Sequence, residues 1–380
     1  MTALAIEEPL PAPRLARTLE LLAIGGITFF LFPLAWLPRA SLGLDEAELA
    51  VGFVCFHAAH FLNDPHFAVT YFLFYEDASA RGRGAGVTRP QHARWLVAGV
   101  LVPVALATVL AYALATRDAQ SIGWMAQVMY LTVGWHYAKQ GFGALTVVTA
   151  RRGITFTDRE RTAMLAHCYA AWAFAWASPS VAAGEFEEKG VVYWAPARPL
   201  WLELATGAVF AITTLALAAV LFARWRRTRT LPWAELACFF VTVWIWTIAT
   251  SLDPLVRYVI PALHSIQYLF FVWLVRRNQA RASEHTFGPS PTTRVAILAV
   301  SAMVLGWLLF RGGPAALDAL YVARSGGEDR MGDMGPTPFF AVLYVFVNIH
   351  HYAMDFVLWR RESPTARWLR DPVIAAGVPG

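Results

Sequence analysis

The sequence predicts an all-α fold, a polytopic transmembrane helix bundle of about ten spans. Of its 380 residues, 57% are hydrophobic and only 15% are charged, whereas a soluble chain normally carries about 25% charged residues. The apolar residues also occur in runs of about 20, the length that a helix needs to cross the hydrocarbon core of a bilayer. Composition and run length together assign the chain to a membrane, with the lipid bilayer as its first partner.

Ten apolar stretches follow one another along the chain. The predicted spans are 20–38, 48–76, 94–115, 121–149, 160–178, 199–223, 232–251, 256–275, 294–311 and 337–359. The longest connections, 179–198 and 312–336, contain glycine, proline and acidic residues and are expected to be loops. We therefore expect one transmembrane domain over 20–360, a cytoplasmic N-terminal segment over 1–19 and a cytoplasmic tail over 361–380.

The charges of the connections predict the orientation. Basic residues cluster at every second connection, as at Arg151, Arg152 and Arg226, and the alternate connections are neutral or acidic, as at Glu187 and Asp333. The positive-inside rule then places both termini in the cytoplasm, and the expected location is a bacterial inner membrane. Because the basic residues lie in short loops, the net charge of +5 does not indicate a nucleic-acid partner.

Seven of the ten histidines lie in four short motifs within predicted spans, FHAAHFLNDPHF, GWHYAKQGFG, PALHSIQYL and NIHHYAMDF. These histidines are His57, His60, His66, His136, His264, His350 and His351. An ionisable side chain at membrane depth is costly and indicates function by default, and histidine is the commonest metal ligand. On the predicted topology the four spans run in the same direction and bring their histidines to about the same depth, as a shared site requires. The alternative is a polar seam between packed helices.

Carboxylates accompany two of the motifs. His60 and Asp64 are spaced i,i+4 and share a helical face, and so do His351 and Asp355. Pro65 removes a backbone donor and predicts a kink beside Asp64. Imidazole combined with carboxylate suits iron, zinc or copper. We therefore expect Asp64 and Asp355 to act in catalysis, as ligands or by orienting ligands.

Two polar residues follow His136 on the same helical face, namely Lys139 and Gln140. A lysine at this depth must reach the interface or pair with an anion. Both side chains are expected to act in catalysis, by orienting oxygen, a substrate or a carboxylate.

The motifs resemble the broad class of bacterial polytopic membrane oxygenases, in particular the carotene-cleaving dioxygenases associated with bacterial rhodopsins. The likeness rests on membrane histidines beside an aspartate, from His60 to His66, and on histidines contributed by separate spans; it covers the four motif helices. It implies metal-dependent oxygen chemistry on a lipophilic substrate such as a carotenoid, a sterol or a fatty acyl chain. Membrane desaturases and hydroxylases are less similar, because this chain has neither of their HxxxH and HxxHH boxes in clean form.

We therefore expect a membrane oxidoreductase with one or two non-haem iron ions, held by ligands from the seven motif histidines. Zinc and copper are alternative metals, and an electron donor is an expected partner. A second hypothesis is a b-haem electron carrier with axial histidines on facing helices, for example His60 with His264 or His136 with His351. A third is a proton or solute transporter lined by histidine, aspartate and lysine. The sequence has no inverted repeat, which speaks against the transporter.

Overall fold

The chain is predominantly helical, as the sequence predicts. The computed structural model describes residues 14–369 except 77, 79–86, 250–253 and 283–289. Residues 1–13 of the predicted N-terminal segment and residues 370–380 of the predicted tail therefore lie outside the described residues.

Long helices make up most of the described chain, and π-helical turns interrupt several of them. The first half contains α1 (Arg14–Leu21), η1 (Leu22–Gly26), α2 (Thr28–Leu42), α3 (Leu44–Ala59), α4 (Asn63–Tyr75), α6 (Arg89–Leu96), η2 (Val97–Leu101), α7 (Val102–Thr116), α8 (Ala119–Arg151) and α9 (Asp158–Ala177). The second half contains α10 (Leu200–Thr228), α11 (Trp233–Phe240), η3 (Val241–Ala249), α13 (Pro254–Ala282), α14 (Pro291–Trp307), η4 (Leu308–Gly312), α15 (Gly313–Arg324) and α16 (Pro338–Leu358). Short 3₁₀ turns follow at Glu328–Arg330, Gly332–Met334 and Ala366–Leu369.

The predicted span 48–76 is two helices, because the chain breaks at residues 60–62 between α3 and α4. The amide of His60 bonds the carbonyl of His57 at 3.3 Å, three residues back, and the φ of Leu62, at −119°, departs from the usual helical value of about −60°. Pro65 lies in the first turn of α4, where a residue without a backbone donor is tolerated. The kink expected beside Pro65 thus exists, but it lies on the N-terminal side of this proline.

The two longest predicted loops both contain regular structure. Within 312–336, α15 continues α14 through η4, so that one helix runs over Thr292–Arg324. Within 179–198, the strands β1 (Gly184–Glu188) and β2 (Val191–Ala195) pair as an antiparallel hairpin. Its two turn residues, Lys189 and Gly190, both have positive φ, as a two-residue hairpin turn of type I′ requires.

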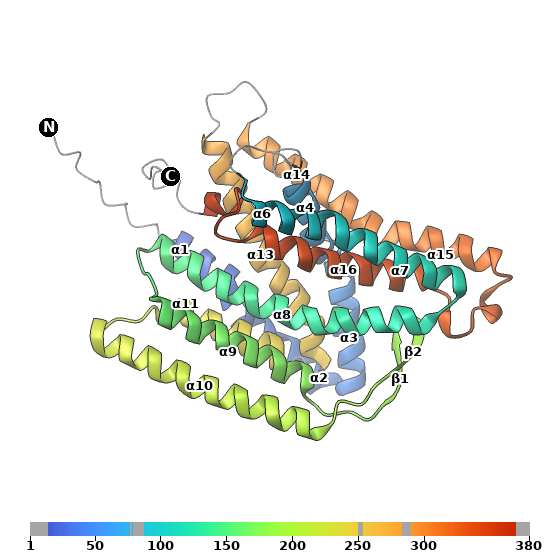
Figure 1. The fold of residues 1–380 in the computed structure, drawn as a ribbon, viewed down its shortest axis with the longest axis horizontal. Coiled ribbons are helices and arrows are strands. Elements are labelled where there is room, and N and C mark those ends of the chain that lie inside the picture. Colours follow the sequence, from blue (N-terminus) through green and yellow to red (C-terminus); the bar gives the residue numbers. More distant parts are fainter. Residues whose placement is uncertain (1–13, 77, 79–86, 250–253, 283–289, 370–380) are drawn as a thin grey trace.

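The helices lie against one another along the long axis of the molecule. In Figure 1, α10, α9, α8 and α16 follow one another across the molecule, with α7 and α15 beyond α16 and with α13 running obliquely behind. The neighbours in this series are in contact, and α13 also packs against α2, α3 and α4. The hairpin packs against α8, at the end of the molecule where α8 begins (Figure 1).

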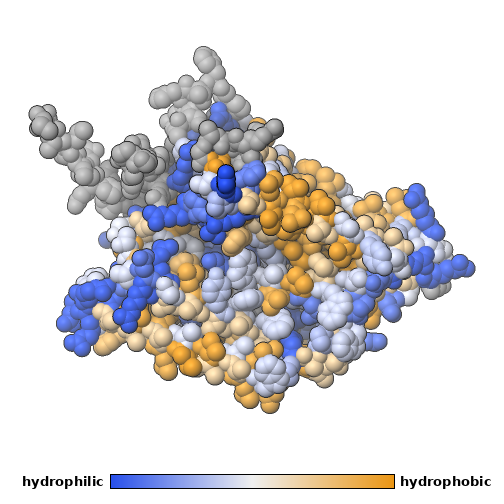
Figure 2. Space-filling view, viewed as in Figure 1, coloured by the Kyte–Doolittle hydropathy of each residue, from blue (hydrophilic) through white to orange (hydrophobic). Residues whose placement is uncertain are grey.

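Five helices of the described chain are long and apolar enough to cross a membrane, judged by length and composition. They are Arg89–Thr116, Leu200–Thr228, Leu255–Ala280, Thr292–Arg324 and Pro338–Leu358. Figure 2 shows hydrophilic side chains at both ends of the long axis, and between them hydrophobic side chains mixed with residues of intermediate hydropathy. The structure thus supports embedding in a membrane, whereas the count of ten spans and the position of the termini stay predictions.

Ion pairs join helices at the end where α8 finishes and α9 begins. Glu160 accepts from Arg224 at 2.8 Å and from Arg227 at 2.9 Å, which ties the start of α9 to the end of α10. Arg152, just after α8, pairs with Glu20 of α1 at 2.8 Å and with Glu235 of α11. These arginines belong to basic connections that the sequence assigns to the cytoplasmic side.

Candidate metal centre

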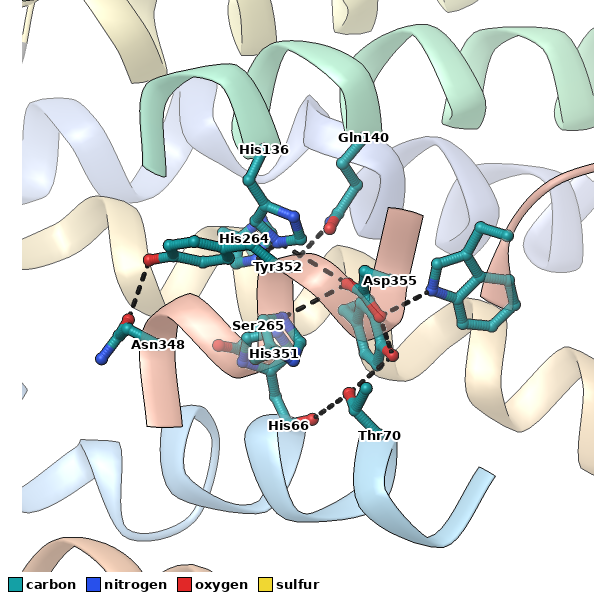
Figure 3. Close-up of polar contacts among 12 residues, drawn as sticks. His66, Thr70, His136, Gln140, His264, Ser265, Asn348, His351, Tyr352 and Asp355 are labelled. Atoms are coloured by element: carbon teal, nitrogen blue, oxygen red, sulfur yellow. Dashed lines mark hydrogen bonds and ion pairs between the residues drawn. The ribbon is translucent and has the colours of Figure 1, made fainter. Parts of the chain in front are cut away.

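Four histidines from four separate helices meet in the interior. They are His66 of α4, His136 of α8, His264 of α13 and His351 of α16, and all are at most 4% exposed. Each offers a ring nitrogen, and these four nitrogens all lie within 4.8 Å of one another. Figure 3 shows the four rings pointing toward a common point between the helices. We call these residues the four-histidine cluster.

The rings pack edge to face. The ring centroids of His66 lie 4.9 Å from His264 and 4.5 Å from His351. His136 lies 5.0 Å from His351, measured between the ring centroids. The Nε2 atoms of His136 and His264 are 3.1 Å apart. A tetrahedral ion with bonds of about 2.1 Å needs its ligand nitrogens about 3.4 Å apart. This pair is slightly closer than that, whereas the four nitrogens together lie within 4.8 Å of one another, so the cluster as a whole is more open than a tetrahedral site.

One carboxylate faces the cluster, that of Asp355 on α16, which is 6% exposed. Its Oδ2 atom lies 3.2 Å from Nε2 of His351 and 3.7 Å from Nε2 of His136. Its Oδ1 atom accepts hydrogen bonds from Tyr268 at 2.8 Å and from the indole of Trp359 at 3.2 Å. These two donors fix the carboxylate so that its second oxygen is presented to the histidines.

Further polar contacts hold the helices around the cluster. Tyr268 is also within hydrogen-bonding distance of Thr70 on α4, at 2.7 Å, so a chain of contacts runs from α4 through α13 to Asp355. Gln140 donates to the carbonyl of His264 at 3.2 Å and to Gln267 at 2.9 Å. These contacts fix the relative positions of α4, α8 and α13 beside their histidines (Figure 3).

A hydrogen bond within α16 supports the cluster from the other side. Tyr352 donates to Asn348 at 2.8 Å, and its ring centroid lies 4.8 Å from that of His136. Asn348 in turn donates to the carbonyl of Tyr344 at 2.8 Å. The ring of Tyr352 is thereby held against one histidine of the cluster.

Several polar atoms of the cluster have no hydrogen-bond partner among the described residues. These are both ring nitrogens of His66 and of His351, Nδ1 of His264 and Oδ2 of Asp355. Buried polar groups in folded proteins are nearly always satisfied by a partner, and leaving them bare is expensive. Ring nitrogens and a carboxylate oxygen that converge in this way fit a bound cation, and imidazole with carboxylate is a donor set for iron, zinc or copper.

The other three motif histidines lie outside the cluster. His350 is buried and turned to α4, where its Nδ1 lies 3.1 Å from the hydroxyl of Tyr71 and its Nε2 3.4 Å from that of Tyr75. His57 is exposed at the surface of α3, beside the ring of Phe53. His60 lies in the break after α3 and is half-buried. The structure thus brings together four of the seven predicted ligands.

The structure also places the other three predicted catalytic residues, Asp64, Lys139 and Gln140. Asp64 is 3% exposed and pairs with Arg311 at 3.1 Å, so its carboxylate is engaged away from the cluster. Lys139 is half-buried, with its ammonium 6.0 Å from the ring centroid of Phe142 and 5.8 Å from that of Tyr169 on α9. Gln140 braces His264, as described above. Of the predicted catalytic residues, Asp355 is the one whose carboxylate faces the histidines.

Sequence reasoning missed two residues that support the site, namely Trp359 and Arg311. Trp359 had a readable signal, because it is spaced i,i+4 from Asp355, as Tyr268 is from His264. Arg311 stood at the end of the predicted span 294–311 and read as the start of a loop. The structure instead places it within the continuous helix over Thr292–Arg324.

Fold and site together define a membrane-type helical protein with a buried four-histidine cluster. Comparison with known proteins adds no name to this class, because no family model, curated protein or solved structure matches the chain.

Proposed function

We propose that the protein is an integral-membrane, metal-dependent oxidoreductase of the oxygenase type that acts on a lipophilic substrate. Its metal would be held by His66, His136, His264 and His351, with Asp355 as a further ligand or as the anion that balances the charge. The proposal rests on the buried four-histidine cluster, whose ring nitrogens lie within 4.8 Å of one another. When bound, the metal would supply Lewis-acid and redox chemistry at the meeting point of the four helices.

The charge of the site is a second observation that supports the proposal. Asp355 is buried, and no lysine or arginine of the described residues pairs with it; its neighbours are two histidines, a tyrosine and a tryptophan. An isolated carboxylate is very costly to bury without a compensating charge. A divalent cation held by the four imidazoles would provide that charge beside the carboxylate, and it would also take up one ring nitrogen of each histidine.

Non-haem iron and an apolar substrate agree best with these surroundings. A donor set of imidazoles and one carboxylate, without thiolates, is typical of iron sites that activate oxygen, and zinc and copper accept related sets. The side chain of Phe67 packs with its ring centroid 4.7 Å from that of His351, and Phe310 packs on Phe67 at 5.1 Å. An apolar wall of this kind, in a helix bundle with an apolar surface (Figure 2), suits a substrate that arrives from the lipid phase.

The geometry weighs against a bis-histidine haem at this site. A haem iron takes its two axial imidazole nitrogens about 4 Å apart on opposite faces of a flat macrocycle. Here four ring nitrogens lie within 4.8 Å of one another, and the macrocycle would overlap at least two of the rings. The four-histidine cluster matches a single small ion more closely.

Metal analysis of the purified full-length protein tests the proposal. The wild-type protein is expected to retain iron after purification in detergent and to show no Soret band. His351→Ala removes a cluster ligand and is expected to abolish stoichiometric metal binding. His350→Ala is the matched control, because it changes the adjacent residue of the same helix outside the cluster, and it should retain the metal.

Three results of the metal analysis would contradict the proposal, and each has a different meaning. Equal loss of metal in both variants would indicate a general defect of folding and would contradict the assignment of His351. A Soret band in the wild type would replace the proposal with haem electron transfer. No metal in protein prepared both with and without oxygen would leave a proton or solute pathway as the better account of the histidines.

A further inference from the structure

Arg311 is a charged residue deep within an apolar helix, and its contacts assign it a role. At 1.5 Å per residue it lies about 20 Å before Arg324, the end of that helix. A guanidinium at such a depth requires partners. The structure supplies the carboxylate of Asp64, with Nε and Oδ2 3.1 Å apart, and the backbone carbonyl of Phe56, which accepts from Nη2. The guanidinium also lies 4.5 Å from the ring centroid of Phe56.

The two partners of Arg311 lie on opposite sides of the break between α3 and α4. In an unbroken helix the Phe56 carbonyl would accept from the amide of His60, four residues on. That amide bonds His57 instead, so the carbonyl of Phe56 is released from the helix and is capped by the guanidinium. Asp64 belongs to the first turn of α4. One side chain therefore holds the last turn of one helix and the first turn of the next.

The helix that carries Arg311 is shaped to reach the break. Its π-helical turn η4 covers Leu308–Gly312, and in such a turn residues five apart approach the same face. Gly306, five residues before Arg311, packs on the backbone of Asp64, where a Cβ atom would lie 2.7 Å from the carbonyl carbon and oxygen. On the side of α13, the hydroxyl of Ser265 donates to Asn63 at 3.1 Å. The first turn of α4 is thus held from two sides.

We propose that Arg311 is a positioning residue that sets the place of His66 in the metal centre by fixing the break between α3 and α4. This inference rests on the proposed metal centre. His66 follows Asp64 by two residues in the same turn of α4, so a shift of the backbone at Asp64 moves the imidazole directly. On this account Asp64 acts on the metal through the position of the helix and is not itself a ligand.

Cobalt(II) binding to the full chain in detergent tests the role, with the visible ligand-field absorption as the readout. Arg311→Gln is expected to weaken Co²⁺ binding by about 10- to 100-fold, the loss typical of residues that orient metal ligands, and to alter the spectrum. Arg311→Lys keeps the charge beside Asp64 but lacks the planar fork that reaches two partners, so a smaller loss is expected. Arg324→Gln, an exposed position of the same helix, is the matched control and should bind Co²⁺ as the wild type does.

A second comparison separates positioning of His66 from general stability. In a His66→Ala background, Arg311→Gln is expected to cause no further loss of Co²⁺ affinity, whereas in a His136→Ala background its effect should persist. Unchanged affinity and spectrum in Arg311→Gln would overturn the inference, and so would an equal loss in both backgrounds. If Arg311→Gln does not fold, Arg311→Lys and Asp64→Asn carry the same test. Wild-type protein that binds no Co²⁺ would contradict the metal centre itself and this inference with it.

Discussion

Adjacent histidines on α16 have opposite surroundings. His351 meets the cluster with both ring nitrogens free of hydrogen bonds, whereas His350 is engaged by Tyr71 and Tyr75. One residue along an α-helix turns the side chain by about 100°, so only one of two neighbours can face a given point. The sequence predicts that both histidines lie within a membrane span. Which of them enters the four-histidine cluster depends on how α16 is rotated against α4 and α8.

Asp355 carries the charge of the site, and its orientation depends on Tyr268. We expect Asp355→Asn to weaken Co²⁺ binding by more than 100-fold, because the compensating charge is lost while the shape is kept. Tyr268→Phe removes one of the two donors to Oδ1. It should weaken Co²⁺ binding by about tenfold, the smaller end of the loss that is typical when a residue that orients a metal ligand is removed.

Titration of the purified variants with Co²⁺ measures both effects. Tyr71→Phe is the control, since that hydroxyl contacts His350 outside the cluster, and its affinity should match the wild type. Equal affinities for Asp355→Asn and the wild type would show that the carboxylate neither binds nor balances the metal.

At the scale of the elements, α8 depends on a close contact with the hairpin. Gly123 lies beneath the ring of Tyr193, and a Cβ atom at that position would overlap the ring. The hydroxyl of Tyr193 also accepts from Gln127 of the same helix at 2.8 Å. The contact fixes the hairpin over the end of the helix that carries His136.

Gly123→Ala is therefore expected to destabilise the protein by about 1 to 3 kcal/mol, the usual cost of overpacking. Gly143→Ala on the same helix is the control, because a Cβ there meets no atom within 4 Å, and helix propensity alone favours alanine by about 1 kcal/mol. Thermal unfolding in detergent measures both. A melting temperature that rises in Gly123→Ala by as much as in Gly143→Ala would show that the added methyl group has no steric cost against the hairpin.

The positions of the helices were predictable, because length and hydropathy are properties of each stretch by itself. The break at 60–62 and the continuation of α14 into α15 were not, since both depend on contacts between distant residues. Arg311 can lie inside an apolar helix only because Asp64 and Phe56 receive it. The convergence of histidines from four helices followed from their common depth, but which ring of each motif turns inward did not.

At the scale of the whole molecule, the arrangement of charges predicts which end faces the cytoplasm. The end formed by Arg226 and its neighbours after α10 should lie inside, and the connection containing Asp333 should lie outside. In intact cells, a membrane-impermeant maleimide is expected to label Asp333→Cys and not Arg226→Cys, since both positions are exposed. Labelling of Arg226→Cys alone would invert the orientation. The wild-type chain, in which two of the three cysteines are buried, measures the background labelling of the native cysteines.

The order in which the chain is made constrains when the four-histidine cluster can form. His66, His136 and His264 belong to α4, α8 and α13, whereas His351 and Asp355 belong to α16, the last of the long helices. Chains are synthesised from the N-terminus and their early parts fold first. Three histidines of the four-histidine cluster are therefore made before its fourth histidine and Asp355. On the proposed function, a complete set of ligands would exist only once α16 has packed against the other three helices.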